Sequence, residues 1–219
     1  MLFITNRFPE QSIRTRLGRN FSFDLDNNAA SNSVFFYESG SNEKHTEIGN
    51  IEFLSQLKSC KYCQVLIYIH GFSNLPKGVL EAAEELQTLC NKKKKNEILV
   101  IPVIWPCDND LGIVKDYWDD QKAADQSAFS FSRVLEKFLA WRSTQKFNPE
   151  SDPCLKRINV LAHSMGNRVL RETLFAWHKY DLPKGLPMMF RNTFLVSADV
   201  VTEAFHSGEP GEINLPCFP

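Results

Sequence analysis

The sequence predicts an α/β fold in which a mostly parallel sheet is flanked by helices and preceded by antiparallel strands. Continuous apolar runs, typical of strands buried on both faces, recur after residue 63. Segments with apolar residues three and four positions apart, typical of amphipathic helices, separate these runs. Because strand and helix alternate repeatedly, the connections favour a parallel sheet covered by helices.

The first 50 residues predict short strands that form an antiparallel edge or flap. The segments "FITNR", "FSFDL" and "SVFFYE" are rich in aromatic and β-branched residues, and polar stretches separate them. His45 follows the last of these segments and is expected in a polar loop. We expect a single domain over 1–219, with N-terminal strands and loops in 1–50, the core in 51–205 and a tail in 206–219.

The core is predicted to contain four parallel strands with helices between them. The strands correspond to the apolar runs "QVLIYIH", "EILVIPVIW", "RINVLAHS" and "NTFLVSAD". The apolar periodicity predicts helices over residues 77–91, 119–141 and 168–180. A turn region, "DLPKGLP", ends the last of these helices.

Composition and charge exclude several classes of function. Of the 219 residues 43% are hydrophobic, and the formal net charge is -1, so no nucleic-acid partner is expected. No apolar run approaches the roughly 20 residues needed to span a bilayer, and the N-terminus does not resemble a signal peptide. We therefore expect a cytoplasmic protein without a membrane span.

No metal or cofactor is predicted. Six cysteines are expected as free thiols, and Cys60 and Cys63 form a C-x-x-C pair without a second pair of ligands at zinc-site spacing. Neither a P-loop nor a G-x-G-x-x-G pattern is present, so no nucleotide cofactor is expected.

The stretch "INVLAHSMGNRVL" carries the main functional prediction. Ser164 lies between a predicted buried strand and a predicted helix, in the pattern A-x-S-x-G formed with Ala162 and Gly166. Small residues at these flanking positions allow a sharp strand-to-helix turn that exposes a nucleophilic serine. The common form of this motif has glycine at both positions, so an ordinary turn is the alternative interpretation.

Two backbone N–H groups are predicted to form an oxyanion hole beside this serine. In the nucleophile-elbow geometry one donor belongs to the residue after the serine, here Met165. The other belongs to a loop after an earlier strand, here Phe72 in "HGF". His70, Gly71 and His163 are expected to support these loops, and strand alternation predicts that His163 points away from the nucleophile.

These motifs resemble a known family. The segments "IYIHGF", "VIPVIWP", "YWDDQKAADQS" and "LAHSMGNRVL" are similar to the α/β-hydrolase family of unknown function marked by H-G-F, W-P, Y-x-x-D-x-x-x-A-x-x-S and A-H-S-M-G-N. The segment "VSADV" resembles the next strand end of that family, and the likeness covers roughly residues 64–205.

The resemblance implies an α/β-hydrolase-like fold with esterase- or lipase-like serine chemistry. It implies that Ser164 is the nucleophile and that Phe72 and Met165 donate to the oxyanion. Tyr117 and Asp120 match the family's Y-x-x-D, for which helix-start packing or a polar network is the expected role.

The acid and the base are predicted from the chain order of serine, acidic residue and histidine. Asp199 ends the strand after the serine helix, although it could also cap a helix or brace the strand end. His206 follows in the right order, but it is close to Asp199 and no predicted strand presents it. In the resembled family two further strands follow, so the last strands of the fold are expected to be missing here.

Two functions are consistent with this sequence. The first is a serine hydrolase acting on a small-molecule ester, a lipid-like substrate or a related acyl bond. The second is a catalytically inactive or incomplete hydrolase fold that serves as a binding or scaffold module. Because the strand near residues 193–198 would become a sheet edge, a second copy or a partner chain is expected to cover it. The chain could also be a fragment of a longer hydrolase.

Overall fold

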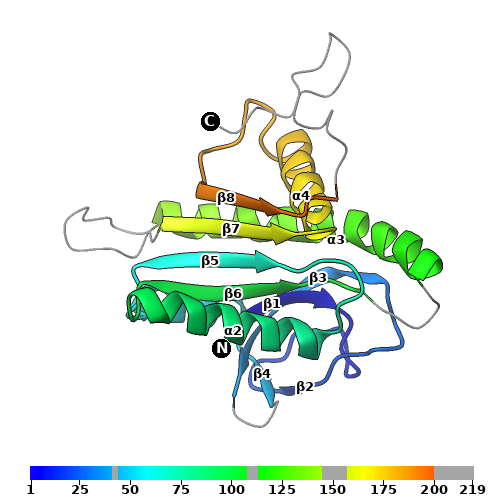
Figure 1. Cartoon of the computed structure of the whole chain (residues 1–219), viewed down its shortest axis with the longest axis horizontal. Helices are drawn as coiled ribbons and strands as arrows, with labels where there is room; N and C mark the ends of the chain where they lie inside the picture. Colours follow the sequence, from blue (N-terminus) through cyan, green and yellow to red (C-terminus); the bar gives the residue numbers. More distant parts are fainter. Residues whose placement is uncertain (41–43, 108–112, 145–156, 200–219) are drawn as a thin grey trace.

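The structure is a computed structural model that describes residues 1–40, 44–107, 113–144 and 157–199. Within these residues an eight-stranded sheet carries helices on both faces (Figure 1). The strands are β1 (Leu2–Arg7), β2 (Asn20–Phe21), β3 (Ala30–Ser39), β4 (His45–Glu47), β5 (Gln64–Ile69), β6 (Ile98–Ile104), β7 (Arg157–His163) and β8 (Phe190–Val196). The helices are α1 (Gly49–Ser59), α2 (Pro76–Lys93), α3 (Ile113–Thr144) and α4 (Gly166–Tyr180).

The sheet joins a parallel half to an antiparallel half in the order β2-β4-β3-β1-β6-β5-β7-β8. The pairings β1–β6, β6–β5, β5–β7 and β7–β8 are parallel. The pairings β1–β3, β3–β4 and β4–β2 are antiparallel. The predicted α/β class is therefore confirmed, and the N-terminal strands continue the central sheet through β1.

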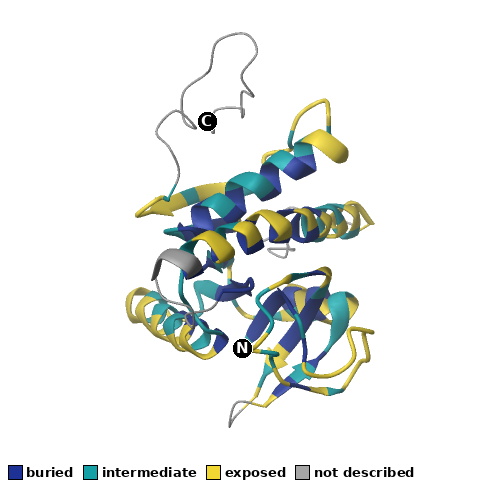
Figure 2. Ribbon diagram, turned by 90° about the vertical axis from the view of Figure 1, so that its right-hand side faces the viewer, coloured by how far each residue is buried: buried dark blue, intermediate teal, exposed yellow. Residues whose placement is uncertain are grey.

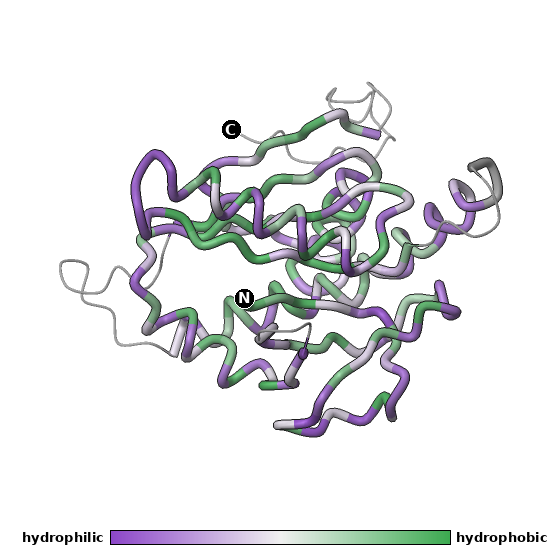
Figure 3. Tube along the Cα trace, turned by 60° about the horizontal axis from the view of Figure 1, so that its bottom comes forward, coloured by the Kyte–Doolittle hydropathy of each residue, from purple (hydrophilic) through white to green (hydrophobic). Residues whose placement is uncertain are grey.

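Helices cover the two faces of the sheet unequally. Helices α1, α3 and α4 contribute to one apolar cluster, which contains strand residues such as Val65, Val103 and Val160. Helix α2 packs on the other face, where Ala83 meets Leu66 and Val100. Figure 3 shows the apolar character of the central strands in green. No helix within the described residues is long and apolar enough to cross a membrane.

The N-terminal region contains two elements that the sequence did not reveal. Strand β4 has the polar sequence His-Thr-Glu, yet His45 is buried, and its ring lies edge-on to Phe3 at 5.2 Å. The expectation of a polar loop at His45 was therefore wrong, because aromatic neighbours and the buried pair Arg19–Glu47 accommodate the polar side chains. Helix α1 was also missed, although it buries Phe53 and two leucines at helical spacing.

Strand β8 forms one edge of the sheet, as the sequence predicts. It pairs with β7, and no described strand lies on its other side. Figure 2 shows β8 coloured mostly as exposed. The exposed fraction is 49% for Phe194, 37% for Leu195 and 40% for Val196. An exposed strand of this kind offers unpaired backbone groups and apolar surface to another segment.

Candidate active site

Ser164 lies on a tight turn between β7 and α4. Strand β7 ends at His163, helix α4 begins at Gly166, and Ser164 has a φ of 50°. This left-handed conformation is uncommon for residues other than glycine and costs about 1–3 kcal/mol. The surrounding contacts therefore have to stabilise the turn. Its half-buried serine remains partly accessible to solvent.

Hydrogen bonds fix the backbone of Ser164 on both sides. Its N–H donates to the Val196 carbonyl at 2.9 Å. Its carbonyl accepts from the Asn167 N–H at 3.0 Å, the Asn167 side-chain amide at 2.8 Å and the Asp199 N–H at 3.3 Å. The turn is thus attached to the end of β8 and to the first turn of α4. Sequence reasoning assigned no role to Asn167, although it is part of the quoted A-H-S-M-G-N motif.

Two glycines allow the neighbouring backbone segments to approach the turn. A Cβ added at Gly166 would lie 2.5 Å from the His70 carbonyl oxygen and 2.6 Å from the Ile69 carbonyl oxygen. A Cβ added at Gly71 would lie 2.8 Å from the Ser164 Cβ. All three distances are shorter than real Cβ contacts, so the end of β5 packs against the serine turn in a way that excludes side chains.

The predicted oxyanion donors lie at this junction. Met165 is fully buried at the N-cap of α4, and Phe72 follows Gly71 in the loop after β5. Within the part of the chain that the structure describes, neither backbone N–H donates a hydrogen bond. The N-terminus of α4 also carries a partial positive charge that favours an anion.

His70 is a buried structural histidine. Its Nδ1 lies 2.9 Å from the Gly71 carbonyl oxygen, and its Nε2 accepts from the Trp105 N–H at 3.2 Å. The Trp105 indole donates to the His70 carbonyl at 2.9 Å and stacks on the imidazole with ring centroids 5.0 Å apart. Burial lowers the pKa of His70 to about 4, so the ring is neutral near pH 7. A neutral ring with Nδ1 protonated satisfies both contacts.

Strand alternation predicts that His163 points away from Ser164, yet its ring lies against the loop that contains Gly71. Its Nδ1 and the Ser164 Cβ lie against the same side of Gly71, at 2.9 Å and 2.8 Å from the position of an added Cβ. The reversal of φ at Ser164 ends the strand geometry on which side-chain alternation depends.

Asp199 lies beside the serine turn and contacts Tyr117 of α3. The Tyr117 hydroxyl is 3.1 and 3.2 Å from the two carboxylate oxygens and donates to one of them. Burial raises the pKa of Tyr117, and the negative charge and hydrogen bond of Asp199 raise it further. The Tyr117 ring also meets the Phe72 ring edge-on at 5.8 Å, so Tyr117 bridges the two sides of the site.

Asp120, one turn further along α3, is fully buried beneath the same loop. It accepts hydrogen bonds from the Ser73 N–H at 3.1 Å, the Cys107 thiol at 2.6 Å and the Asn28 side-chain amide at 2.9 Å. The Y-x-x-D pattern therefore belongs to a polar network around the strand ends, which was one of its expected roles. The sequence analysis did not single out Cys107. Its place directly after "WP", at the end of an apolar run, is the signal that could have indicated it.

The other candidate residues lie either outside the described part of the chain or in other segments. His206 lies outside the described residues. Cys60 is half-buried and Cys63 is exposed, both as free thiols. Across residues 1–40, 44–107, 113–144 and 157–199, no group of three or more histidine, cysteine or acidic side chains could hold a metal ion.

A comparison with protein families supports the alpha/beta class of the sheet. A family model described as an alpha/beta hydrolase of unknown function (DUF900) matches residues 46–209. The chain belongs to this family. No curated protein and no solved structure matched the chain significantly. The family match spans β5 to β8, the segment that builds the turn at Ser164, so this alpha/beta hydrolase carries its candidate site within the matched region.

We predict that Gly166→Ala destabilises this alpha/beta hydrolase by about 3 kcal/mol, since the added methyl group would overlap two backbone carbonyls that cannot rotate away. Gly78→Ala is the matched control, because nothing lies within 4 Å of a Cβ at that position of α2. The control should be more stable by about 0.5–1 kcal/mol, as expected for alanine in a helix. Urea unfolding measures both values, and equal stabilities would contradict the close packing.

We also predict that acidification destabilises the protein through His70. Between pH 6.5 and about 4 the unfolded chain protonates this imidazole while the folded chain does not. The free energy of unfolding should therefore fall by about 1.4 kcal/mol per pH unit as the pH decreases through this window. Urea unfolding at pH 7.5, 6 and 5 should show a flatter profile for His70→Gln. Parallel profiles for the two proteins would show that His70 is not the responsible group.

Proposed function

We propose that this protein is a serine hydrolase that cleaves an ester or a related acyl bond, with Ser164 as the nucleophile. The conformation of Ser164 is the observation that carries the proposal. A non-glycine residue with φ of 50° stands at the end of a central parallel strand, directly before a helix. Strain of this kind clusters at functional sites, and the strand-to-helix turn is the position at which hydrolases of this fold present a nucleophile.

The surrounding backbone suits stabilisation of a tetrahedral intermediate. Attack of the Ser164 hydroxyl on an acyl carbon places negative charge on the former carbonyl oxygen. The N–H groups of Met165 and Phe72 are the proposed donors to this oxyanion, and the N-terminus of α4 adds a favourable dipole. Gly71 permits this arrangement because it keeps the Phe72 loop against the serine turn.

Asp199 is the proposed acid of the catalytic triad, and His206 is the proposed base. Asp199 lies beside Ser164, since its N–H donates to the serine carbonyl at 3.3 Å. The Tyr117 hydroxyl holds its carboxylate by a hydrogen bond. His206 has the chain order that the mechanism requires. A histidine oriented by Asp199 would accept the serine proton and later return it to the leaving group.

A fluorophosphonate probe tests the nucleophile. The wild-type protein should be labelled, whereas Ser164→Ala should show only background labelling and should lose turnover of short-chain nitrophenyl esters by several orders of magnitude. Ser143→Ala is the control, because the hydroxyl of this exposed serine of α3 donates to the Ala140 carbonyl within its own helix. Labelling of Ser164→Ala at the wild-type level would overturn the assignment of the nucleophile.

Substitutions of Asp199 and of Tyr117 test separately how the charge and the orientation of the proposed acid affect kcat. Asp199→Asn should lower kcat by on the order of 10⁴-fold, because the amide cannot stabilise a protonated histidine. Tyr117→Phe should lower kcat by about tenfold, because the carboxylate keeps its charge but loses one hydrogen bond. Tyr180→Phe, at an exposed position, serves as the control. Wild-type kcat in Asp199→Asn would show that another group is the acid.

A binding or scaffold function is the second candidate, and the surface of β8 favours it. Phe194, Leu195 and Val196 expose apolar area along an edge strand, which suits pairing with a second copy or a partner chain. This function predicts an intact turn at Ser164 without esterase turnover. Robust hydrolysis that disappears in Ser164→Ala would exclude a purely binding role.

A further inference from the structure

The peptide unit between Gly71 and Phe72 has its carbonyl group fixed by two side chains. The Gly71 oxygen accepts from His70 Nδ1 at 2.9 Å and from the Asn74 side-chain amide at 3.1 Å. In a planar trans peptide the carbonyl and the following N–H point in opposite directions. The Phe72 N–H is therefore directed away from these two donors.

Ser164 lies close to this peptide unit. A Cβ at Gly71 would lie 2.8 Å from the Ser164 Cβ, so only a glycine hydrogen separates the two backbones. A rotation of the peptide unit would move the Phe72 N–H relative to the serine. Oxyanion donors have to lie about 2.7–3.1 Å from the developing charge, and a displacement of 1 Å can lower the rate about 100-fold. The groups that prevent this rotation therefore affect the proposed chemistry.

Asn74 holds two successive carbonyls with one side-chain amide. Its Nδ2 donates to the Gly71 oxygen at 3.1 Å and to the Phe72 oxygen at 2.7 Å. The two hydrogens of the amide allow both bonds at once. The Asn74 backbone N–H points to the Cys107 sulfur at 3.4 Å, which connects the loop to the segment after β6.

Asp120 anchors both Ser73 and Cys107 from α3. Its Oδ2 accepts from the Ser73 N–H at 3.1 Å and from the Cys107 thiol at 2.6 Å. Cys107 Sγ is also 3.7 Å from the Gly71 oxygen, but the thiol has one proton, and the shorter contact with the carboxylate takes it. Burial and the neighbouring Asp120 charge raise the pKa of Cys107, so the thiol stays protonated as a donor.

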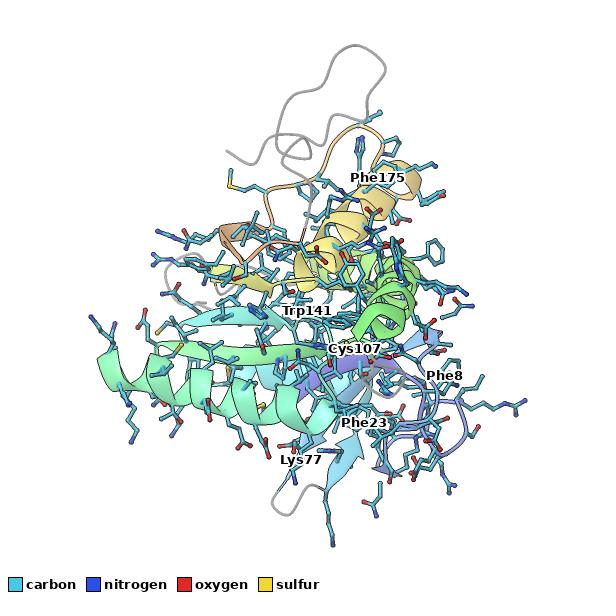
Figure 4. The ribbon with its side chains drawn as sticks, turned by 45° about the vertical axis from the view of Figure 1, so that its right-hand side comes forward. Phe8, Phe23, Lys77, Cys107, Trp141 and Phe175 are labelled. Carbon is cyan, nitrogen blue, oxygen red and sulfur yellow. The ribbon has the colours of Figure 1, made fainter. Side chains whose placement is uncertain are left out.

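The anchored loop has little freedom of its own. Ser73 has a φ of 57°, a left-handed conformation that its hydrogen bond to Asp120 stabilises. Asp120 and Cys107 are fully buried, and Figure 4 shows Cys107 in the interior of the molecule beside α3. These two side chains lie beneath the loop and therefore cannot themselves contact a substrate bound at Ser164.

We propose that Asp120, Cys107 and Asn74 are positioning residues that hold the Phe72 N–H toward the acyl oxygen of a substrate at Ser164. This inference rests on the proposed hydrolase function. Three chain segments contribute one residue each: the loop after β5, the segment after β6 and helix α3. They act through the backbone of residues 71–74 and control the placement of the oxyanion donor, while substrate binding in the ground state does not depend on them.

Comparison of ground-state and transition-state binding tests this proposal. Butylboronic acid forms a tetrahedral adduct with an active serine and places an oxygen in the oxyanion hole. In Cys107→Ala, kcat for a nitrophenyl butyrate and the affinity for butylboronic acid should both fall about tenfold, while KM changes less than threefold. Cys107→Ser keeps a hydroxyl donor for Asp120 and should restore both quantities to within threefold of the wild-type values.

Asp120→Asn should give a larger loss of kcat and boronate affinity, on the order of 100-fold, because the loop loses its charged acceptor. Asp119→Asn is the matched control on the same helix, since this residue is exposed and its contact with the Asn28 amide is long, at 3.4 Å. The control should stay within twofold of the wild type. Wild-type boronate affinity in both Cys107→Ala and Asp120→Asn would overturn the proposal, as would an equal loss of affinity in Cys107→Ser and Cys107→Ala.

Amide hydrogen exchange measures how readily the loop opens, and this measurement does not depend on catalysis. Amides of residues 71–75 should exchange faster in Asp120→Asn and Cys107→Ala than in the wild type or Asp119→Asn, while those of β7 remain unchanged. Unaltered exchange in this loop would overturn the proposed positioning, whether or not the protein hydrolyses an ester. Failure of the hydrolase function appears separately, as wild-type fluorophosphonate labelling no stronger than that of Ser164→Ala.

Discussion

The close backbone contact between the end of β5 and the start of α4 determines the geometry of the whole site. Gly166 lies so near the carbonyls of Ile69 and His70 that no side chain fits between them. This contact sets where α4 begins and therefore where Ser164 reverses the chain direction. It also places the loop that contains Gly71 beside the serine. The strand ends, the serine turn and the candidate oxyanion donors form one packed unit as a result.

The strands and the strand-to-helix turn of this unit could be predicted from the sequence because they have strong local signals. Apolar runs located β5 to β8, and the small residues around Ser164 located the turn between β7 and α4. Strand β4 gave no such signal, because its three residues are polar and become buried only through tertiary contacts. The partners of Asp120 were equally hidden, since they come from segments that the fold brings together over long distances in the chain.

Buried polar groups show why the site depends on the fold as a whole. Asp120 is surrounded by donors from a loop, a cysteine and the N-terminal region, and His70 is neutral between a carbonyl and an N–H. A buried polar atom without a partner costs about 1–3 kcal/mol, so each group constrains the position of its partners. The hydrogen bonds that offset the cost of burying these polar groups therefore also limit the conformations available to the loop after β5.

Strand β8 links the candidate site to the exposed edge of the sheet. The Val196 carbonyl accepts from the Ser164 N–H at 2.9 Å and from the Asn167 side chain at 3.3 Å, and Asp199 follows three residues later. The side chains of Phe194 and Leu195, in the same strand, are partly exposed. A chain that paired with this edge would restrain β8 and, through the Val196 carbonyl, the serine turn. The proposed binding at the edge and the proposed chemistry at Ser164 are thus not independent alternatives, because a single strand connects the two surfaces.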